Sequence, residues 1–581
     1  MNSQRELPSV RAAAVGGAAA ALAAGVAMAI VRWALLVRSV PERVMEWLLL
    51  FVPLDVFEAG LVRLGFDAKR YALYAAIAGT LVVLGALGTL ALRRRWSTRA
   101  ILVLGFGLWL FVMLVILPLT SAGVFALGLL DGTRANVGGY LAVALVYAAI
   151  LAAASALIDG APSPVAGRGH TWTSVPSRRT ALLMMGGALT SYLATLAVVR
   201  WGPKGRQLQQ VIVLDPQQPV PSGGVDPAHP HPEAVGTSPP AATQPVAAAG
   251  PYEPPPARVL RRDQDGAVLP SGRRPGEVAE PITSNDDFYI VTKNAAGDPQ
   301  PTAAEWRLVI DGEVGRTVQL DYPSLRNLPA VELTKTLECI SNFVAKCELA
   351  PFGCDLISTA RWRGVRLSDL LELAGGVKPG VVSLAVIAAD EFSTALPIEA
   401  ALAPDTLLVY EMNGQVLPRE HGYPARVLVP GRYGMKNAKW VVALRAMSRE
   451  FVDWYGQRNW SRQAIVKTMT RIDSPAPGAV LPPGEHRIAG IAYAGDRGVA
   501  KVEFSADGGA TWEVADLLAP ALGRDTWVRW EGRFRLPDRA TLTLMARATD
   551  GTGALQIEAF SLPQPDGGSG WFSVEVQTPR A

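Results

Sequence analysis

All three cysteines of this 581-residue chain lie in one short stretch, TKTLECISNFVAKCELAPFGC, between Thr334 and Cys354. A thiolate is a soft ligand for a transition metal, and it is also a nucleophile. Two neighbouring thiols form a disulfide in an oxidising compartment. Three kinds of chemistry are therefore open to Cys339, Cys347 and Cys354: a metal site, a catalytic thiol and a disulfide.

Cys339 differs from the other two cysteines in its local sequence. It follows the strand-like VELTKTLE and precedes Ser341-Asn342, which is typical of a turn. A nucleophilic Cys339 would need a base, and His421 is the only plausible histidine in the same part of the chain. A buried, inert cysteine is the alternative interpretation.

Cys347 and Cys354 are separated by six residues, and Pro351 and Gly353 between them allow a tight loop. Outside the cytoplasm a disulfide is the simplest use of such a pair, and two free thiols are the alternative. A zinc site that used all three cysteines would need a fourth ligand, and no C-x-x-C spacing is present.

A second candidate segment, EHGYPARVLVPGRYGMKNAKW, spans Glu420 to Trp440. Its glycines allow close approach of the backbone to a ligand, and clustered cations suit a phosphate or another anion. A basic surface loop is the alternative interpretation. The residues concerned are His421, Arg426, Arg432, Lys436 and Lys439, with Gly431 and Gly434.

The elements that must position these residues follow a long apolar region. Hydrophobic residues make up 50% of the chain and are concentrated in its first two hundred residues, while the net charge of +4 gives no case for nucleic acid. Five segments are apolar over roughly 20 residues, which predicts about five transmembrane helices in residues 1–201. They lie at about 12–31, 71–92, 100–119, 138–158 and 180–199. The segment PERVMEWLLLFVPLDVFEAGLVRLG carries charges and a proline, so we interpret it as an interfacial helix.

Charge predicts the orientation of these helices. The loop RRRWSTR and the loop with Arg178 and Arg179 should be cytoplasmic by the positive-inside rule. The protein is then a multi-pass plasma-membrane protein whose chain after residue 200 is extracytoplasmic, in the periplasm. The stretch SRRTALLMMGGALTSYLATLA looks like an internal twin-arginine export signal, although paired arginines also simply anchor the cytoplasmic end of a helix.

The rest of the chain divides into a linker and two soluble domains. Residues 202–282 are rich in Pro, Gly and Ala and predict a mostly disordered tether. Within residues 283–462, WRLVIDGEV and VVSLAVIAA predict strands and RLSDLLELAG a short helix that ends at Gly375, so this domain is α+β. Residues 463–581 alternate as strands, which predicts an all-β, immunoglobulin-like sandwich.

Taken in order, several separated motifs resemble the sulfite oxidase family of molybdopterin-dependent oxidoreductases. They are ITSNDDFYIVTKN, WRLVIDGEV, TLECISN, DLISTARWRGVRLSDLLELAG, ADEFSTALPI, MNGQVLPREHGYPARVLVPGRYGMKNAKWV and KVEFSADGGATW. The resemblance implies a molybdopterin domain over 283–462 and a dimerisation-type domain after it. It also implies a molybdenum cofactor with a single pterin, and oxygen-atom transfer with two-electron cycling of the metal.

The resemblance also implies roles for individual residues. Cys339 in TLECISN occupies the place of the molybdenum ligand, and would be the catalytic residue. Residues that correspond to those that bind the pterin and its phosphate are Asn285, Tyr289, Asp390, His421, Arg426, Lys436, Asn437, Ala438 and Lys439. Arg361, Trp362 and Arg363 are interpreted as pocket or packing residues, with core packing preferred for Trp362.

This sequence departs from the family pattern in two places. Sulfite oxidases continue from the ligand cysteine as C-x-G-N-R-R, whereas Cys339 is followed by ISNFVAKC, without an arginine. Sulfite as the substrate is therefore in doubt. The chain also inserts FVAKCELAPFGC, which carries Cys347 and Cys354, beside the expected metal ligand.

The sequence thus predicts a membrane-anchored, outward-facing molybdenum oxidoreductase that acts on a small oxo compound or oxyanion. No histidine lies in the spans, and no C-x-x-C-H or flavin motif is visible, so neither haem nor flavin is expected. Electrons would pass to or from a separate partner, cytochrome- or quinone-linked, and a homodimer is a further expectation. The alternative is a non-enzymatic surface protein whose β-sandwich binds a partner.

Overall fold

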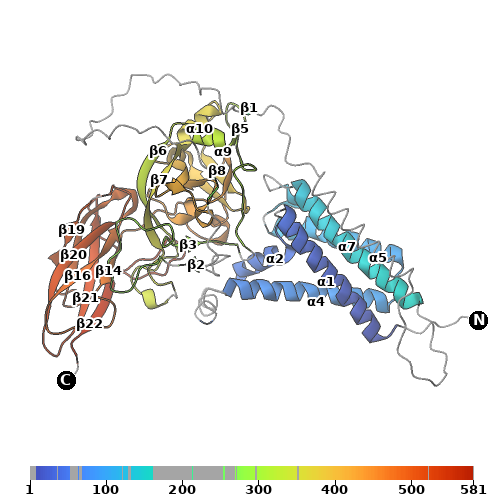
Figure 1. Cartoon of the computed structure of the whole chain (residues 1–581), viewed down its shortest axis with the longest axis horizontal. Coiled ribbons are helices and arrows are strands. Elements are labelled where there is room, and N and C mark those ends of the chain that lie inside the picture. The colour runs from blue at the N-terminus through green and yellow to red at the C-terminus, as the bar shows by residue number, and fades with distance from the viewer. Residues whose placement is uncertain are drawn as a thin grey trace, which may run out of the picture. The chain divides into compact units, whose positions relative to one another are not determined.

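The structure is a computed structural model. It describes residues 8–160 apart from 36, 53–62, 64–67, 121 and 128–132, then 212–213, 253–254 and 268–269, and finally 271–579 apart from 295–296, 350–351 and 521. The chain divides into two compact units, Met1–Leu208 with Asn294–Gly297, and Gln209–Lys293 with Asp298–Ala581. Each unit is described by itself (Figure 1).

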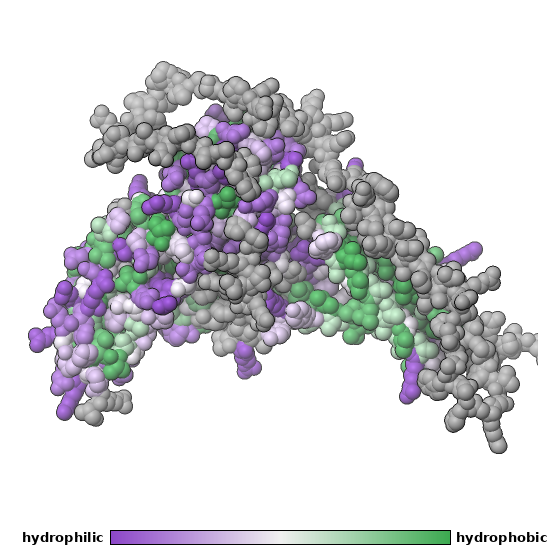
Figure 2. All heavy atoms as spheres, viewed as in Figure 1, coloured by the Kyte–Doolittle hydropathy of each residue, from purple (hydrophilic) through white to green (hydrophobic). Residues whose placement is uncertain are grey.

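The first unit is helical. Its long helices are α1 (Val10–Leu35), α4 (Ala68–Arg93) and α7 (Thr133–Gly160); α5 (Thr98–Phe111) continues through the π-helical turn η3 (Val112–Ile116) into α6 (Leu117–Leu119). Four helices are long and apolar enough to cross a membrane by length and composition. Hydrophobic residues gather on their described surface (Figure 2). They correspond to the first four predicted spans. The fifth, at 180–199, and the twin-arginine stretch lie outside the described residues.

Small residues bring α1 and α4 close together. A Cβ added at Gly17 would lie 2.5 Å from the carbonyl oxygen of Gly85 and 2.6 Å from Oγ1 of Thr89. Glycine is therefore required at this crossing, as is common where membrane helices contact one another through their backbones.

The charges that interrupt the second apolar segment are paired within the helical unit. Helix α2 (Val40–Leu48) starts with a capping box between Ser39 and Glu42, and Glu42 forms an ion pair with Arg32 of α1 at 3.2 Å. Nε of Arg43 donates to the Tyr140 hydroxyl of α7 at 3.0 Å. These polar contacts attach α2 to both neighbours, while its interfacial position stays a prediction.

The second unit begins with the mixed α+β domain. A six-stranded sheet has the order β1-β5-β4-β13-β8-β9, and a five-stranded sheet runs β11-β10-β7-β6 with β12 paired to β10. The predicted strands correspond to β4 and β8, and the predicted helix to α10, after which Gly375 has a φ of +81°. The strand bounds are β1 (Ile212–Val213), β2 (Val268–Leu269), β3 (Ile290–Val291), β4 (Arg307–Gly312), β5 (Val318–Asp321), β6 (Val331–Glu338), β7 (Ile357–Arg366), β8 (Ser383–Ala388), β9 (Ser393–Pro397), β10 (Leu407–Met412), β11 (Gln415–Val416), β12 (Arg426–Leu428) and β13 (Val441–Met447); the helices are α9 (Tyr322–Arg326), α10 (Leu367–Leu373) and α11 (Ile398–Ala401).

The C-terminal part is built from strands, as predicted. One sheet has the order β14-β16-β20-β19 and the other β15-β22-β21-β17-β18. Buried and more exposed residues alternate along β21 and β22, so one face of their sheet packs inward. The immunoglobulin-like assignment stays a prediction. The bounds are β14 (Met469–Ser474), β15 (Ala479–Val480), β16 (Gly484–Tyr493), β17 (Val499–Ser505), β18 (Glu513–Val514), β19 (Asp516–Leu518), β20 (Val528–Leu536), β21 (Thr541–Asp550) and β22 (Phe572–Gln577).

The α+β domain and the C-terminal part share a polar contact beside β6. Lys335 of β6 is buried and forms an ion pair with Asp525, which precedes β20. The same carboxylate accepts hydrogen bonds from the Tyr493 hydroxyl at 2.7 Å and from the amide of Gly431 at 3.3 Å. Because β6 leads directly to Cys339, this network helps to fix the strand that carries the thiol.

Replacement of Lys335 by Met should therefore destabilise the second unit. Asp525 would lose its ion-pair partner in a partly buried place and keep two hydrogen-bond donors, so we expect a loss of about 3 kcal/mol in the free energy of unfolding. Denaturant unfolding of the full chain in detergent, followed by tryptophan fluorescence, measures this. The matched control is Lys378→Met, because Lys378 pairs with Glu313 at 3.3 Å on the surface, where a salt bridge contributes about 1 kcal/mol or less. Equal losses for both variants would contradict the assigned role.

Candidate functional site

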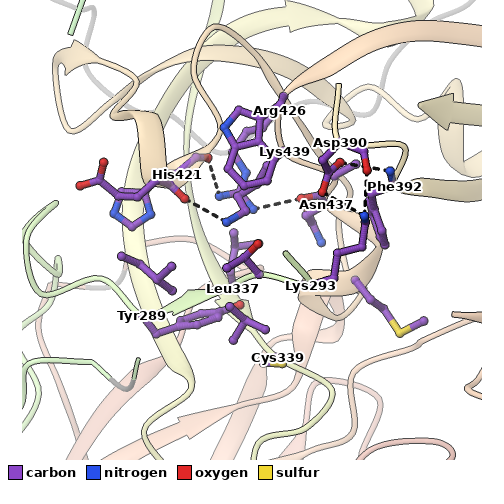
Figure 3. A pocket seen from close by; sticks show the side chains of 18 of the residues that line it. Tyr289, Lys293, Leu337, Cys339, Asp390, Phe392, His421, Arg426, Asn437 and Lys439 are labelled. Carbon is purple, nitrogen blue, oxygen red and sulfur yellow. Dashed lines mark hydrogen bonds and ion pairs between the residues drawn. The ribbon is translucent and has the colours of Figure 1, made fainter. Parts of the chain in front are cut away.

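A cavity in the α+β domain gathers side chains that are far apart in the sequence. Its walls come from β3 and the residues before it, the end of β6, the loop after β8, the 3₁₀ turn η6 (Arg419–His421), β12 and the turn η7 (Gly434–Lys436) with the residues after it. Figure 3 shows Cys339 and Tyr289 at one side of the cavity and Arg426 with Lys439 at the other.

Cys339 lies at the end of β6 in a fixed turn. Its amide donates to the carbonyl of Leu356 at 2.9 Å, and its carbonyl accepts from the amide of Asn342 at 2.9 Å. The Asn342 side chain accepts from the amide of Leu356 at 3.0 Å and donates to Glu338 at 2.9 Å. Cys339 forms no disulfide, and its exposed fraction is 7%. The thiol is therefore held rigidly at the cavity wall.

Glu338, the residue before the thiol, is fully buried. Burial raises the pKa of its carboxyl group to about 8, so it carries a proton at neutral pH. Its Oε2 has no hydrogen-bond partner among the residues that the structure describes. Glu338 thus supports the Cys339 turn without placing a full negative charge beside it, a role that the sequence did not suggest.

The other two cysteines form a separate feature. The structure joins Cys347 and Cys354 by a disulfide with a Cα–Cα distance of 5.1 Å. Neither lines the cavity. The inserted loop instead packs toward the C-terminal part, where Val344 belongs to a hydrophobic cluster with Tyr433 and Trp527. The three thiols therefore do not make one site.

Arg426 is the central cation of the cavity. Its two terminal nitrogens donate to the carbonyls of His421 and Asn437, both at 3.0 Å, and its guanidinium lies 5.2 Å from the centre of the Trp362 ring. Its Nε has no hydrogen-bond partner among the described residues. Burial lowers the pKa of Arg426 to about 10, so it remains charged at neutral pH. An anion in the cavity would relieve this desolvated charge.

Lys439 and His421 lie beside Arg426. Nζ of Lys439 donates to the carbonyl of Glu420 at 3.0 Å, and burial lowers the pKa of this lysine to about 8. Nε2 of His421 lies 2.8 Å from the carbonyl oxygen of Asn285. Since a carbonyl only accepts, Nε2 carries the hydrogen. The backbone carbonyl of Asn285 thus orients the imidazole.

The turn η7 closes against the thiol because it begins with glycine. A Cβ at Gly434 would lie 2.8 Å from the Tyr289 hydroxyl oxygen and 3.8 Å from Cα of Cys339. Asn437 holds the turn from inside, accepting from the amide of Val429 at 2.8 Å and donating to the carbonyl of Tyr433 at 3.0 Å. Close approach of this turn is what the glycine permits.

Most of the predicted site residues line this one cavity: Tyr289, Cys339, Asp390, His421, Arg426, Asn437, Ala438 and Lys439. Asn285 and Lys436 do not. The Asn285 side chain donates to the carbonyl of Met412 at 3.3 Å, and Lys436 pairs with Asp453 at 2.5 Å. Trp362 is fully buried beneath Arg426, in agreement with core packing.

The lining residues that were not predicted include Lys293, Phe392 and Tyr455. Nζ of Lys293 donates to the carbonyl of Asp390 at 2.8 Å and lies 3.5 Å from its carboxylate. Lys293 and Phe392 lie within two of the sequence motifs that resemble the family, ITSNDDFYIVTKN and ADEFSTALPI, close to residues that were predicted to bind the cofactor. Tyr455 follows the last strand of the domain and has no such signal.

The lining residues suit a bound group that is anionic and that also contains a metal ion able to take a thiolate ligand. The cations Lys293, Arg426 and Lys439 converge with a buried thiol, and the Nε of Arg426 still has a hydrogen to donate. Charge-assisted hydrogen bonds from such donors suit a phosphate, and a thiolate suits a transition metal. The chemistry of these donors therefore agrees with a molybdopterin cofactor.

The lowered pKa of Lys439 predicts pH-dependent anion binding by the cofactor-free protein. As the pH rises through about 8, Lys439 loses its charge, so affinity for sulfate should fall about tenfold between about pH 7 and about pH 9. Sulfate keeps its own charge over this range, and calorimetric titration measures the change. Lys439→Met should remove the slope, whereas the exposed-lysine control Lys378→Met should retain it. A wild-type profile that stays flat would contradict the role of Lys439.

Comparison with known proteins agrees with this geometry. Residues 295–455 match the family model of the oxidoreductase molybdopterin binding domain, and residues 463–578 match that of the Mo-co oxidoreductase dimerisation domain. The chain is 33% identical to sulfite oxidase of Gallus gallus over 319 residues, which covers 48% of this chain and 68% of that protein.

More distant relatives were also found. Mitochondrial sulfite oxidase of Mus musculus is 31% identical over 307 residues, covering 46% of this chain and 56% of that protein. Among solved structures, the sulfane dehydrogenase SoxCD from Paracoccus pantotrophus is 25% identical with a TM-score of 0.44, covering 48% of this chain and 76% of that chain. The chain spans only about half to two thirds of the length of the sulfite oxidases that it matches.

These matches confirm the expectation of an oxidoreductase enzyme and support a molybdenum cofactor. They leave the non-enzymatic alternative without support. The matched domains, the cavity and the 33% identity to a relative of which the chain covers 68% agree with one another, and the chain belongs to the sulfite oxidase family of molybdopterin-dependent oxidoreductases.

Proposed function

We propose that this protein uses a molybdenum cofactor, bound in the cavity beside Cys339, to oxidise or reduce a small oxo compound or oxyanion. The observation that carries the proposal is the convergence of a buried thiol, outside any disulfide, with three lining cations on one cavity. When bound, the cofactor supplies two-electron oxygen-atom transfer.

The residues divide by the part of the cofactor that they would hold. Cys339 would be the single protein ligand of the metal, in a turn that Asn342 keeps rigid. Arg426, Lys439 and His421 would bind the pterin and its phosphate, because all three line the cavity and Nε of Arg426 has no hydrogen-bond partner among the described residues. The backbone at Asn437 and Ala438 would complete this cradle.

The substrate would enter on the side of Lys293 and Phe392. Lys293 supplies positive charge there, and Asp390 holds its side chain in place at 3.5 Å. Arg426 is the one arginine among the described residues that line the cavity, and it is occupied with His421 and Asn437. A lysine-based anion subsite of this kind suits a small oxyanion, and sulfite is the first compound to test.

The setting of the enzyme is part of the proposal. The apolar helices would anchor it in the plasma membrane with the catalytic part outside, and the domain boundaries would be those predicted from sequence. Electrons would pass to or from a separate cytochrome- or quinone-linked partner. The match to a dimerisation domain supports a homodimer formed through the immunoglobulin-like part.

Replacement of Cys339 by Ser tests the metal ligand. Serine is a harder and less acidic ligand of similar size, so the fold should persist while oxo-transfer activity falls by about a hundredfold or more. Activity with sulfite and a dye acceptor, together with the molybdenum EPR spectrum, measures this.

The matched control is Cys347→Ser with Cys354→Ser, which removes two cysteines of the same loop region but none that lines the cavity. This double variant should keep its molybdenum and its EPR signal. A Cys339→Ser variant with full activity and an unchanged spectrum would refute the assignment.

A further inference from the structure

The wall of the cavity contains a large residue in a backbone conformation that large side chains rarely adopt. Trp440 directly follows Lys439 in sequence, lines the cavity and is 2% exposed. Its φ is +52°, which lies in the left-handed region. Glycine adopts this region readily, whereas a bulky side chain there is strained. Such strain persists only where the surrounding structure enforces it, and it is concentrated at functional sites.

Three hydrogen bonds hold Trp440 in this conformation. Its amide donates to the carbonyl of Gly422 at 3.2 Å, and its carbonyl accepts from the amide of Ala389 at 2.9 Å. Nε1 of its indole donates to the carbonyl of Arg419 at 2.9 Å. Trp440 therefore joins the turn η6 to the residues that follow β8, and both of these segments contribute to the cavity wall.

The face of the Trp440 indole contacts a cation. Nζ of Lys439 lies 4.3 Å from the centre of the Trp440 ring. A cation within about 6 Å of an aromatic face is attracted to it, and tryptophan is the strongest such partner. Of the three hydrogens of the ammonium group, one donates to the carbonyl of Glu420, and no other hydrogen bond of Nζ is found among the described residues. Lys439 can therefore still donate to an anion beside Arg426 (Figure 3).

The same contact bears on the charge of Lys439. Burial lowers the pKa of this lysine to about 8, so it loses its charge just above neutral pH. The ring attracts the ammonium form and not the neutral amine, so the contact opposes this loss. The titratable groups that surround Lys439 at the cavity are Lys293, Asp298, Asp390, Glu420, His421 and Arg426.

We propose that Trp440 is a positioning residue, whose indole face holds the Lys439 ammonium group in place for the phosphate of the bound cofactor. Trp440 then acts through Lys439 and does not itself bind the anion. The identity of this anion rests on the proposed function. The inference explains why tryptophan occupies a position whose backbone favours glycine, since glycine would offer no aromatic face to Lys439.

Sulfate binding by the cofactor-free full chain in detergent tests this inference. Trp440→Leu and Trp440→Phe both remove the indole donor, but phenylalanine keeps an aromatic face. Calorimetric titrations between about pH 6 and about pH 9 give the midpoint pH at which sulfate affinity falls. This midpoint should decrease by about one unit in Trp440→Leu and by about half a unit in Trp440→Phe.

The midpoint separates positioning of Lys439 from a merely structural role. Loss of packing alone would weaken sulfate binding without moving the midpoint, and the titratable groups around Lys439 are the same in every variant. Trp306→Phe is the matched control, because Trp306 is also 2% exposed and its Nε1 also donates to a backbone carbonyl, that of Val441 at 2.8 Å. Trp306 does not line the cavity, so this variant should keep the wild-type midpoint.

An unchanged midpoint in Trp440→Leu would overturn the inference. If that variant does not fold, an unchanged midpoint in Trp440→Phe would overturn it, as would a wild-type protein that binds no sulfate in this pH range. Wild-type protein that lacks molybdenum after expression in a host that makes molybdopterin would instead refute the proposed function. Because sulfate binding is measured without the cofactor, the two failures are distinguishable.

Discussion

The central constraint on this structure is the burial of positive charge around one cavity. Arg426 is buried and Lys439 partly buried at the same cavity, and their pKa values are lowered because the charged forms are desolvated. Such an arrangement is costly unless an anion shares the space. Three features hold backbone and side chains close to the space for such an anion. They are the turn that begins at Gly434, the strand β6 that leads to Cys339, and the buried ion pair of Asp453 with Lys436.

The fold keeps the two chemistries of the cavity apart. Figure 3 shows Arg426 and Lys439 on one side of the cavity, Lys293 and Phe392 on another, and Cys339 at the wall. A contact between the α+β domain and the C-terminal part also stabilises the strand β6, because Lys335 on β6 is paired with Asp525 next to β20. The C-terminal part therefore contributes to the stability of the strand that carries the thiol.

The sequence predicted the features that depend on local pattern. Cys339 between a strand and a turn, the basic segment from Glu420, the apolar helices and the β-rich C-terminal part were all recognisable. It did not predict side-chain direction. Lys436 was grouped with the ligands because it is a cation near Asn437, yet it faces Asp453, and Asn285 contributes a carbonyl to His421 instead of a side chain. Tyr455 reaches the cavity and Glu338 supports the Cys339 turn only through tertiary packing, for which spacing gives no signal.

The most direct test of the account is the metal content of the purified full chain. Elemental analysis by mass spectrometry, after expression in a host that makes molybdopterin, should find about one molybdenum atom per chain. Release of one pterin per chain on denaturation should accompany it. Protein that is folded and monodisperse but carries neither molybdenum nor pterin would contradict the central claim that the buried cations and Cys339 surround this cofactor.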